Sequence, residues 1–334
     1  MSAVWSLSEE PREAGARSER QERLRWRPYG ALLVGILALA AVDIAGLLLA
    51  DLRLSPWPAL LRLGIPLILM LGAAGYALTG RSERIGATLL SVGTLLLFTL
   101  FAVIFSYLAI RGGWPLADDR LAAWDQALGL DWPAYRSWIM RHRWVAETTG
   151  LLYESSVIQI LGTILFLGFS GRFTVLAEFT AALIISGFVA VSVGAVLPAL
   201  GAYSHYGIPD NGIAFFVPDI TAARDGTLKL LDLGAAQGLV VFPSYHTAIS
   251  IALIIACWQV RWLRYPGLVL NAALLAGVPV WGSHYFIDMI AGTLIVVLPV
   301  LGWRKYHADA DRPRGRATIA DPRSPKKKPS LRSH

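Results

Sequence analysis

Long apolar runs separated by short polar connections dominate the chain. An apolar run of about 20 residues is long enough to cross a bilayer as a helix, so each run is read as a membrane span. The eight predicted spans cover residues 29–50, 58–78, 85–110, 150–169, 173–198, 239–260, 265–282 and 285–303. The pattern therefore predicts an all-α, polytopic integral membrane protein with about eight transmembrane helices.

The composition supports a membrane protein. Hydrophobic residues make up 55% of the chain and charged residues only 16%, with a mean hydropathy of +0.53. A soluble domain carries about 25% charged residues. The first 28 residues hold six Arg and five Glu and lack the apolar core of a signal peptide. We therefore expect residues 1–28 to be a cytoplasmic arm, with the first span acting as its own insertion signal.

The net charge of +7 is concentrated at the C-terminal end. Residues 304–334 contain ten Lys or Arg and three Asp, which equals the whole imbalance. This Pro-rich segment is predicted to be a disordered basic tail on the anionic cytoplasmic surface of the membrane, and no nucleic-acid partner is expected. The single cysteine, Cys257, excludes an intrachain disulfide and a thiolate metal site.

Orientation follows from the position of Lys and Arg in the short loops. Both termini are basic, and so are the loops at 79–84, 170–172 and 260–264. With eight spans, all of these fall on one side, which is predicted to be the cytoplasm. The long connections 111–149 and 199–238 then lie on the extracytoplasmic side. The start of the sixth span and the junction of the last two spans lie there too, and they carry His246 and His284.

The stretch "GSHYFID" places His284 and Asp288 four residues apart at the start of an apolar run. On a helix these side chains share a face, and the carboxylate can accept the Nδ1 hydrogen of the imidazole and leave Nε2 free to act. A structural histidine hydrogen-bonded at a helix end would explain the same spacing. Ionisable groups in a membrane segment are costly and usually functional, which supports a site.

The stretch "VVFPSYHTAIS" contains a second polar group, at the start of the sixth span. Pro243 fits the first turn of a helix, and Ser244 adds a hydroxyl beside free backbone N–H groups, a combination that can hold an anion. His246 in that first turn could donate a proton to a leaving oxygen. Because His246 and His284 share a membrane face, we expect one site.

Two histidines and a carboxylate suit phosphoryl transfer through a covalent phosphohistidine. His284 would attack phosphorus, Asp288 would stabilise the imidazolium, and His246 would act as acid and then as base. The phosphate oxygens also need positive charge, for which Arg224 and Lys229 in the outer loop are candidates, although a solvated loop explains them equally well. This chemistry needs no metal or other cofactor. A zinc site built from the two histidines and the aspartate is the alternative.

These motifs resemble the phosphatidic acid phosphatase type 2 superfamily of membrane lipid phosphatases and phosphotransferases. The family pattern is K-x6-R-P, then P-S-G-H, then S-R-x5-H-x3-D. The chain matches it at Pro243, Ser244 and His246, and again at His284 and Asp288. The resemblance assigns the two histidines and the aspartate the same catalytic roles.

The chain departs from the family pattern at three places. Tyr245 replaces a glycine, Gly277-Val278 replaces Ser-Arg, and no K-x6-R-P precedes the second motif. In these respects the chain is similar to bacterial relatives of inositol-phosphorylceramide synthases, where F-P-S-x-H is typical. The substrate-binding residues expected from the resemblance are Ser244, Arg224, Tyr245, Lys229 and Ser283.

The resemblance implies a six-helix catalytic core over residues 85–303, preceded by two extra transmembrane helices within 29–84. It implies a phosphoric ester hydrolase or phosphotransferase of the inner membrane, acting on a phospholipid or polyprenyl phosphate at the periplasmic face, with phosphoinositol as one group that it could transfer. The acceptor, water or an alcohol such as inositol, stays open. Because the Lys, Arg-Pro and Ser-Arg elements are missing, a lipid-binding or transport protein with a degenerate site is the alternative.

Other polar residues within the spans are expected to pair with each other or to line the site. Asp43 and Arg62 are predicted to form a mutual pair. Glu154 and Gln159, which occur in the fourth span with Tyr153, could line the site or form interhelical hydrogen bonds. Residues 118–145 mix charge with Trp and Leu, which predicts an amphipathic helix on the outer leaflet.

Overall fold

The computed structural model describes the backbone of residues 10–311 and the side chains of residues 28–305. It is almost entirely helical in this range. The elements in chain order are α1 (Glu10–Leu49), β1 (Arg53–Leu54), α2 (Pro56–Thr79), α3 (Glu83–Ile110), α4 (Asp118–Ala127), α5 (Trp132–Arg141), α6 (Arg143–Glu154), α7 (Ser156–Phe169), α8 (Phe173–Val196), α9 (Ala202–His205), α10 (Val217–Arg224), β2 (Leu230–Leu231), α11 (Tyr245–Trp258), α12 (Arg264–Trp281) and α13 (Phe286–Asp311).

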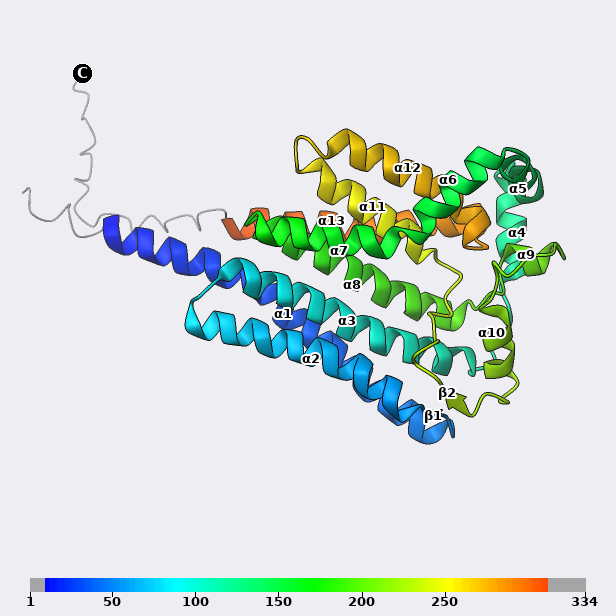
Figure 1. Ribbon diagram of the computed structural model, residues 1–334, viewed down its shortest axis with the longest axis horizontal. Helices are drawn as coiled ribbons and strands as arrows, with labels where there is room; N and C mark the ends of the chain where they lie inside the picture. The colour runs from blue at the N-terminus through cyan, green and yellow to red at the C-terminus, as the bar shows by residue number, and fades with distance from the viewer. Residues whose placement is uncertain (1–9, 312–334) are drawn as a thin grey trace, which may run out of the picture.

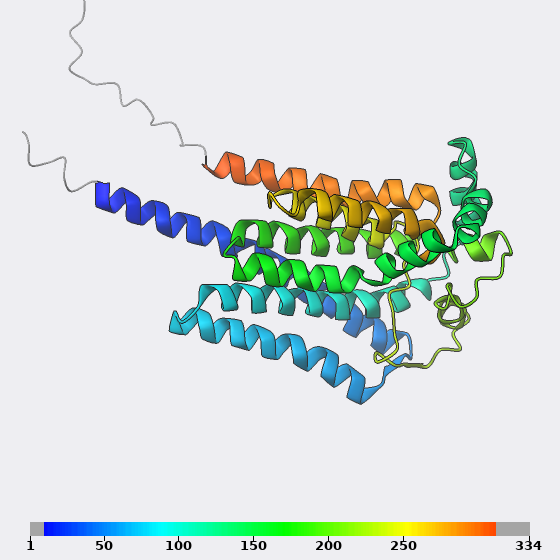
Figure 2. The same ribbon diagram turned by 45° about the horizontal axis from the view of Figure 1, so that its top comes forward.

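The long helices lie side by side in one elongated bundle, and the short helices α4, α5, α9 and α10 gather at one end of it (Figures 1 and 2). The start of α1 and the end of α13 lie at the opposite end, together with the α2–α3, α7–α8 and α11–α12 turns. The bundle therefore separates the short basic loops from the long connections, as the charge pattern predicts.

Membrane crossing is supported for most of the long helices. Five described helices are long and apolar enough to span a bilayer, and the number rises to six if α6 and α7 form one bent span. Helix α11 has only 14 residues, fewer than the about 20 that cross a bilayer unaided. The chain is a multi-pass helical membrane protein, and the count of eight spans stays a prediction.

The helices at both ends of the described chain extend beyond the predicted spans. Helix α1 begins at Glu10, inside the predicted arm, and α13 continues to Asp311. Arg and Glu have high helix propensities, which explains why a helix can form in the arm. Residues 1–9 and 312–334, which include most of the predicted tail, lie outside the described residues.

The connection between α3 and α7 differs from the predicted amphipathic helix. The structure has two short helices, α4 and α5, followed by α6, which meets α7 at a bend of 51°. Asp118 and Asp125 on α4 are buried beside α13 and α9, so α4 belongs to the protein interior at this end of the bundle. The prediction of a single helix lying on the membrane surface is wrong.

The predicted pair between Asp43 and Arg62 is also wrong. Asp43 is buried and neither of its carboxylate oxygens has a hydrogen-bond partner among the described residues. Arg62 instead donates to the Ala236 carbonyl at 3.5 Å. The two side chains are kept apart because α1 packs on α3 and α8, whereas α2 packs mainly on α3.

The core that supports the site is built from α7, α8, α11 and α13. Their inward faces carry small and branched apolar residues, among them Ile164, Leu183, Ala248 and Val296, each with 1% exposure or less. Gly292 permits the closest approach within this group. A Cβ there would lie 2.4 Å from the Ser244 carbonyl oxygen. The glycine therefore lets α13 meet the first turn of α11, which fixes the two motif segments against each other.

Candidate active site

His284 and Asp288 meet at the turn between α12 and α13. The Nδ1 atom of His284 lies 3.1 Å from Oδ2 of Asp288, and the two residues are 3% and 0% exposed. The same carboxylate oxygen accepts the backbone N–H of Tyr285 at 2.9 Å. The structure thus brings together the imidazole and the carboxylate that the spacing predicts, with Nδ1 occupied by the carboxylate.

The environment of His284 favours its neutral form. Burial lowers the pKa of His284 to about 4, and a hydrogen bond to the Val241 carbonyl opposes part of that shift. A neutral imidazole keeps the lone pair that a nucleophile needs. The second oxygen of Asp288, Oδ1, is buried and has no partner among the described residues. The Asp288 carboxylate is therefore in a buried environment in which charge is poorly screened.

Two buried aspartates of α4 hold this turn in place. Asp125 accepts the backbone N–H groups of Phe286 and Ile287 at 2.9 and 2.8 Å, so it caps the start of α13 from another helix. Asp118 accepts the Tyr285 hydroxyl at 2.9 Å and the Gly201 N–H at the same distance. The sequence reasoning missed both residues. Their spacing of seven places them on one face of α4, which was the available signal.

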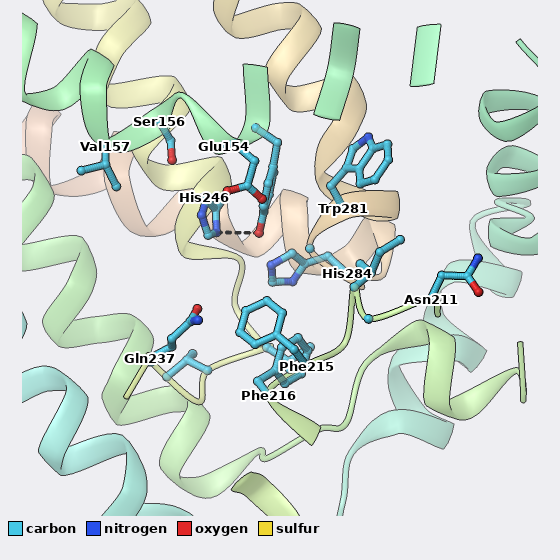
Figure 3. Close-up of a pocket in the computed structure, with 17 residues that line it drawn as sticks. Glu154, Ser156, Val157, Asn211, Phe215, Phe216, Gln237, His246, Trp281 and His284 are labelled. Carbon is cyan, nitrogen blue, oxygen red and sulfur yellow. Dashed lines mark hydrogen bonds between the residues drawn. The ribbon is translucent and has the colours of Figure 1, made fainter. Parts of the chain in front are cut away.

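His246 lies in the first turn of α11 and has a phenol as its partner. Its Nδ1 atom lies 3.1 Å from the hydroxyl of Tyr153, and the two rings stack with centroids 4.3 Å apart and planes 28° from parallel. His246 and His284 lie at the same cavity (Figure 3), and Tyr153 lines it too. Tyr153 therefore both lines the cavity and forms a hydrogen bond to a neighbouring helix, α11.

The cavity has a volume of about 490 Å³ and is lined by His246, His284 and three segments of chain around them. These are the α6–α7 bend, residues 211–216 and residues 237–241. Polar lining groups come from Tyr153, Glu154, Ser156, Asn211 and Gln237, and apolar ones include Val157, Phe215, Phe216 and Trp281 (Figure 3). A cavity lined by apolar side chains and a few convergent polar groups suits an amphiphilic ligand.

No lysine or arginine lines this cavity in the described part of the chain. Arg224 donates to the Trp114 carbonyl at 2.9 Å, and Lys229 lies 3.6 Å from the Asp51 carboxylate. Both cations are bonded to groups outside the cavity. The structure does not bring them to the two histidines.

The other three predicted binding residues have structural partners. Ser244 caps α11, where its hydroxyl accepts the Thr247 N–H at 3.3 Å. The hydroxyl of Tyr245 donates to the Leu183 carbonyl on α8 at 3.0 Å. Ser283 has a positive φ of 57°, and its hydroxyl accepts the Tyr203 N–H at 3.2 Å. None of the three is among the residues that line the cavity.

Comparison with known families finds a match, and it covers the part of the chain that carries this site. A family model described as the PAP2 superfamily matches residues 119–301, which is more than half of the chain. The chain belongs to the PAP2 superfamily. The matched range runs from α4 into α13 and includes His246, His284 and Asp288. No curated protein and no solved structure matches the chain significantly.

PAP2 superfamily membership gives the general class of the protein, because its members are phosphatases and phosphotransferases. Membership therefore supports a membrane enzyme of the lipid phosphatase type at the level of the superfamily. Helices α1, α2 and α3 lie before the PAP2 match. Within the described residues, no group of three or more His, Cys, Asp or Glu is arranged to hold a metal ion, so the zinc alternative finds no geometric support in that part of the chain.

Proposed function

We propose that the protein is a lipid phosphotransferase or phosphatase that works through a phosphohistidine on His284. The observation that carries this proposal is that two histidines line one cavity and differ in their partners, Asp288 for His284 and Tyr153 for His246. One histidine is held by a carboxylate that can stabilise positive charge. The other sits at the start of α11, free to exchange a proton at Nε2.

The proposed reaction has two steps. The lone pair of His284 Nε2 attacks phosphorus, and the bond to the leaving alkoxide breaks. That alkoxide takes the Nε2 proton of His246 and leaves as an alcohol. Water or an alcohol then attacks the phosphohistidine, gives its proton to Nε2 of His246, and releases His284.

The charge of the cavity favours a phosphodiester substrate. The lining contains Glu154 and no lysine or arginine. A phosphate monoester with two negative charges would meet a carboxylate with no counter-charge, whereas a phosphodiester carries one charge only. The positive end of the α11 dipole lies at the cavity through His246 and contributes part of the stabilisation. We therefore propose transfer of a phospho-head group, such as phosphoinositol, from a phospholipid to an alcohol.

The proposed location follows the charge pattern of the loops. Residues 211–216, which line the cavity, lie just before α10, at the end of the bundle that holds α4 and α5 and away from the short basic loops (Figure 1). Because basic loops face the cytoplasm, the site would open on the extracytoplasmic side of the inner membrane, with both termini cytoplasmic. A lipid phosphate reaches such a site from the outer leaflet.

A lipid-binding or transport protein with a degenerate site is the second candidate. The observation that favours it is the same absence of cations from the described cavity lining, because phosphoryl transfer gains much of its rate from positive charge around the phosphate. In this second candidate function, the lipid leaves the cavity chemically unchanged.

Product analysis tests both candidates. The purified protein would be incubated with phosphatidate and with phosphatidylinositol, with and without added alcohol acceptor, beside His284→Ala and a control His205→Ala. His205 lies 3.4 Å from Asp119 and does not line the cavity. We expect His284-dependent products from phosphatidylinositol, and more of them with acceptor. Binding of these lipids with no product from either would favour the lipid-binding candidate.

A further inference from the structure

The two histidines of the site have different kinds of partner. His284 has the carboxylate of Asp288 at Nδ1, whereas His246 has the uncharged hydroxyl of Tyr153. No carboxylate hydrogen-bonds to His246 among the described residues, although Glu154 lines the same cavity. We infer that Tyr153 is a positioning residue that holds His246 as the proton donor to the leaving group; the inference rests on the proposed function.

Tyr153 is fixed in place from several sides. It lies next to the last residue of α6, just before the 51° bend, and is 9% exposed. Its ring covers the His246 ring. A Cβ on Gly282 would lie 2.9 Å from the Tyr153 hydroxyl and 2.5 Å from Cδ2 of His284. The hydroxyl is therefore packed against the backbone of the turn that carries His284. Because it also contacts His246, it fixes the position of one histidine relative to the other.

The proton on Nδ1 explains why a hydroxyl oxygen suits His246. As the acid, His246 is an imidazolium with hydrogens on both nitrogens. As the base, it needs a lone pair on Nε2, so the hydrogen again lies on Nδ1. The Tyr153 oxygen can accept that Nδ1 hydrogen in both states, because a phenol oxygen is an acceptor as well as a donor. The ring then keeps one orientation through both steps.

The absence of charge on this partner matters for proton release. Hydrogen bonds to a carboxylate are about twice as strong as those between neutral groups, and they stabilise the imidazolium. His284 benefits from such a partner because it becomes positive when it is phosphorylated. His246 must give its proton away, and a carboxylate at Nδ1 would hold that proton back. The structure pairs each histidine with the partner that its step requires.

Tyr153→Phe tests this inference, because it keeps the stacked ring and removes only the hydroxyl. The readout is turnover of two phosphoinositol diesters, one with dodecanol and one with 4-nitrophenol as the leaving group. Dodecanol must be protonated as it leaves, whereas 4-nitrophenolate leaves without a proton. We expect turnover of the dodecyl ester to fall about 30-fold, within the about 100-fold or more that general acid catalysis contributes. Turnover of the nitrophenyl ester should change by less than about 3-fold.

Tyr135→Phe is the matched control. Its hydroxyl donates to the Ala276 carbonyl at 2.7 Å, so this change also removes one buried phenol bond near the same end of the bundle, outside the cavity. It should leave the ratio of the two rates unchanged. An equal loss on both esters, or no loss, in Tyr153→Phe would overturn the inference. If the wild-type protein makes no His284-dependent product from either ester, the proposed function itself has failed.

Discussion

Asp288 is the residue on which the chemistry of His284 depends most directly. Its Oδ2 atom accepts from the Tyr285 N–H and faces Nδ1 of the imidazole at 3.1 Å. Asp288→Asn keeps the shape of the side chain but replaces the acceptor-only carboxylate by an amide that can present its N–H₂ group to Nδ1. The imidazole would then lose the tautomer that leaves Nε2 free.

We therefore expect Asp288→Asn to lower turnover by about 100-fold to 10,000-fold, the range seen when a histidine loses its orienting carboxylate or its acid–base role. Lipid binding should be kept, since Asp288 does not line the cavity. Asp119→Asn serves as control, because the Asp119 side chain is 98% exposed. Wild-type turnover in Asp288→Asn would show that the His284–Asp288 pair is structural only.

The pH dependence of turnover follows from the burial of His284. Its pKa lies at about 4 instead of 6.5, so the imidazole stays neutral and nucleophilic as the pH falls from about 7 to 5. Protonation at lower pH removes the lone pair and stops the reaction. With the 4-nitrophenyl diester, whose charge is constant over this range and whose leaving group needs no proton from His246, kcat/KM should hold down to about pH 5 and fall near pH 4. Loss centred near 6.5, reversible on return to neutral pH, would contradict this.

Individual residues show what a single sequence reveals about a site. The motif residues His246, His284 and Asp288 could be found because their types and spacing are local, and the structure brings them to one place. The partner of Tyr245 could not be found in this way. Its hydroxyl donates to the Leu183 carbonyl, a contact that depends on how α8 packs against α11.

At the scale of elements, α4 connects the long segment between α3 and α7 to the site. Asp125 accepts two N–H groups at the start of α13, a role that an N-cap residue of α13 itself would otherwise fill. Burial raises the pKa of the Asp125 carboxyl, and those two N–H donors oppose the shift. The position of His284, two residues before α13, depends on this cap.

We expect Asp125→Ala to lower the free energy of unfolding by about 2 kcal/mol, since a cap is lost and two N–H groups are left without their acceptor. Turnover should fall as well, because the start of α13 shifts relative to His246. Asp131→Ala removes a cap from α5, where Asp131 accepts the Ala134 N–H at 2.9 Å. This control should cost about 1 kcal/mol and leave turnover unchanged. Thermal unfolding in detergent and initial rates measure both effects, and a turnover loss in Asp131→Ala equal to that in Asp125→Ala would refute a special role for α4.

The sequence predicts helical elements well and their ends less well. A helix lies at each of the eight apolar runs, because apolar length is a strong signal in a membrane protein. The bend between α6 and α7 and the division of residues 118–145 into α4, α5 and the start of α6 were not predictable in the same way. Both depend on tertiary packing, since α6 lies along α12 and α4 packs on α13.

At the scale of the whole molecule, the two ends of the bundle differ in chemistry. One end has the short basic turns and the described ends of the chain, and the other has the cavity and the short helices (Figure 2). The parallel pairing of β1 with β2 ties the α1–α2 connection to the loop before α11 at the cavity end. Helices α1 and α2 lie before the PAP2 match, and the strand between them helps to hold the loop before α11 in place.

Labelling with a membrane-impermeant maleimide tests this orientation. In a Cys257→Ala background, Asp225→Cys follows α10 and Arg81→Cys lies in the α2–α3 turn, and both positions are exposed. We expect Asp225→Cys to react from the outside in intact spheroplasts and Arg81→Cys to react only after the membrane is opened. The reverse result would place the site in the cytoplasm.

We propose that His284 carries the phosphoryl group during turnover. Trapping the phosphohistidine tests this most directly. The protein would be mixed with phosphatidylinositol labelled with ³²P in its phosphate, denatured in alkali within a turnover, and digested. We expect an alkali-stable, acid-labile label on the peptide that contains His284, and no such label in His284→Ala. His246→Ala slows the second step, so with the nitrophenyl ester, labelled in the same way, this variant should accumulate more label. Product formation with no label on this peptide at any time would contradict it.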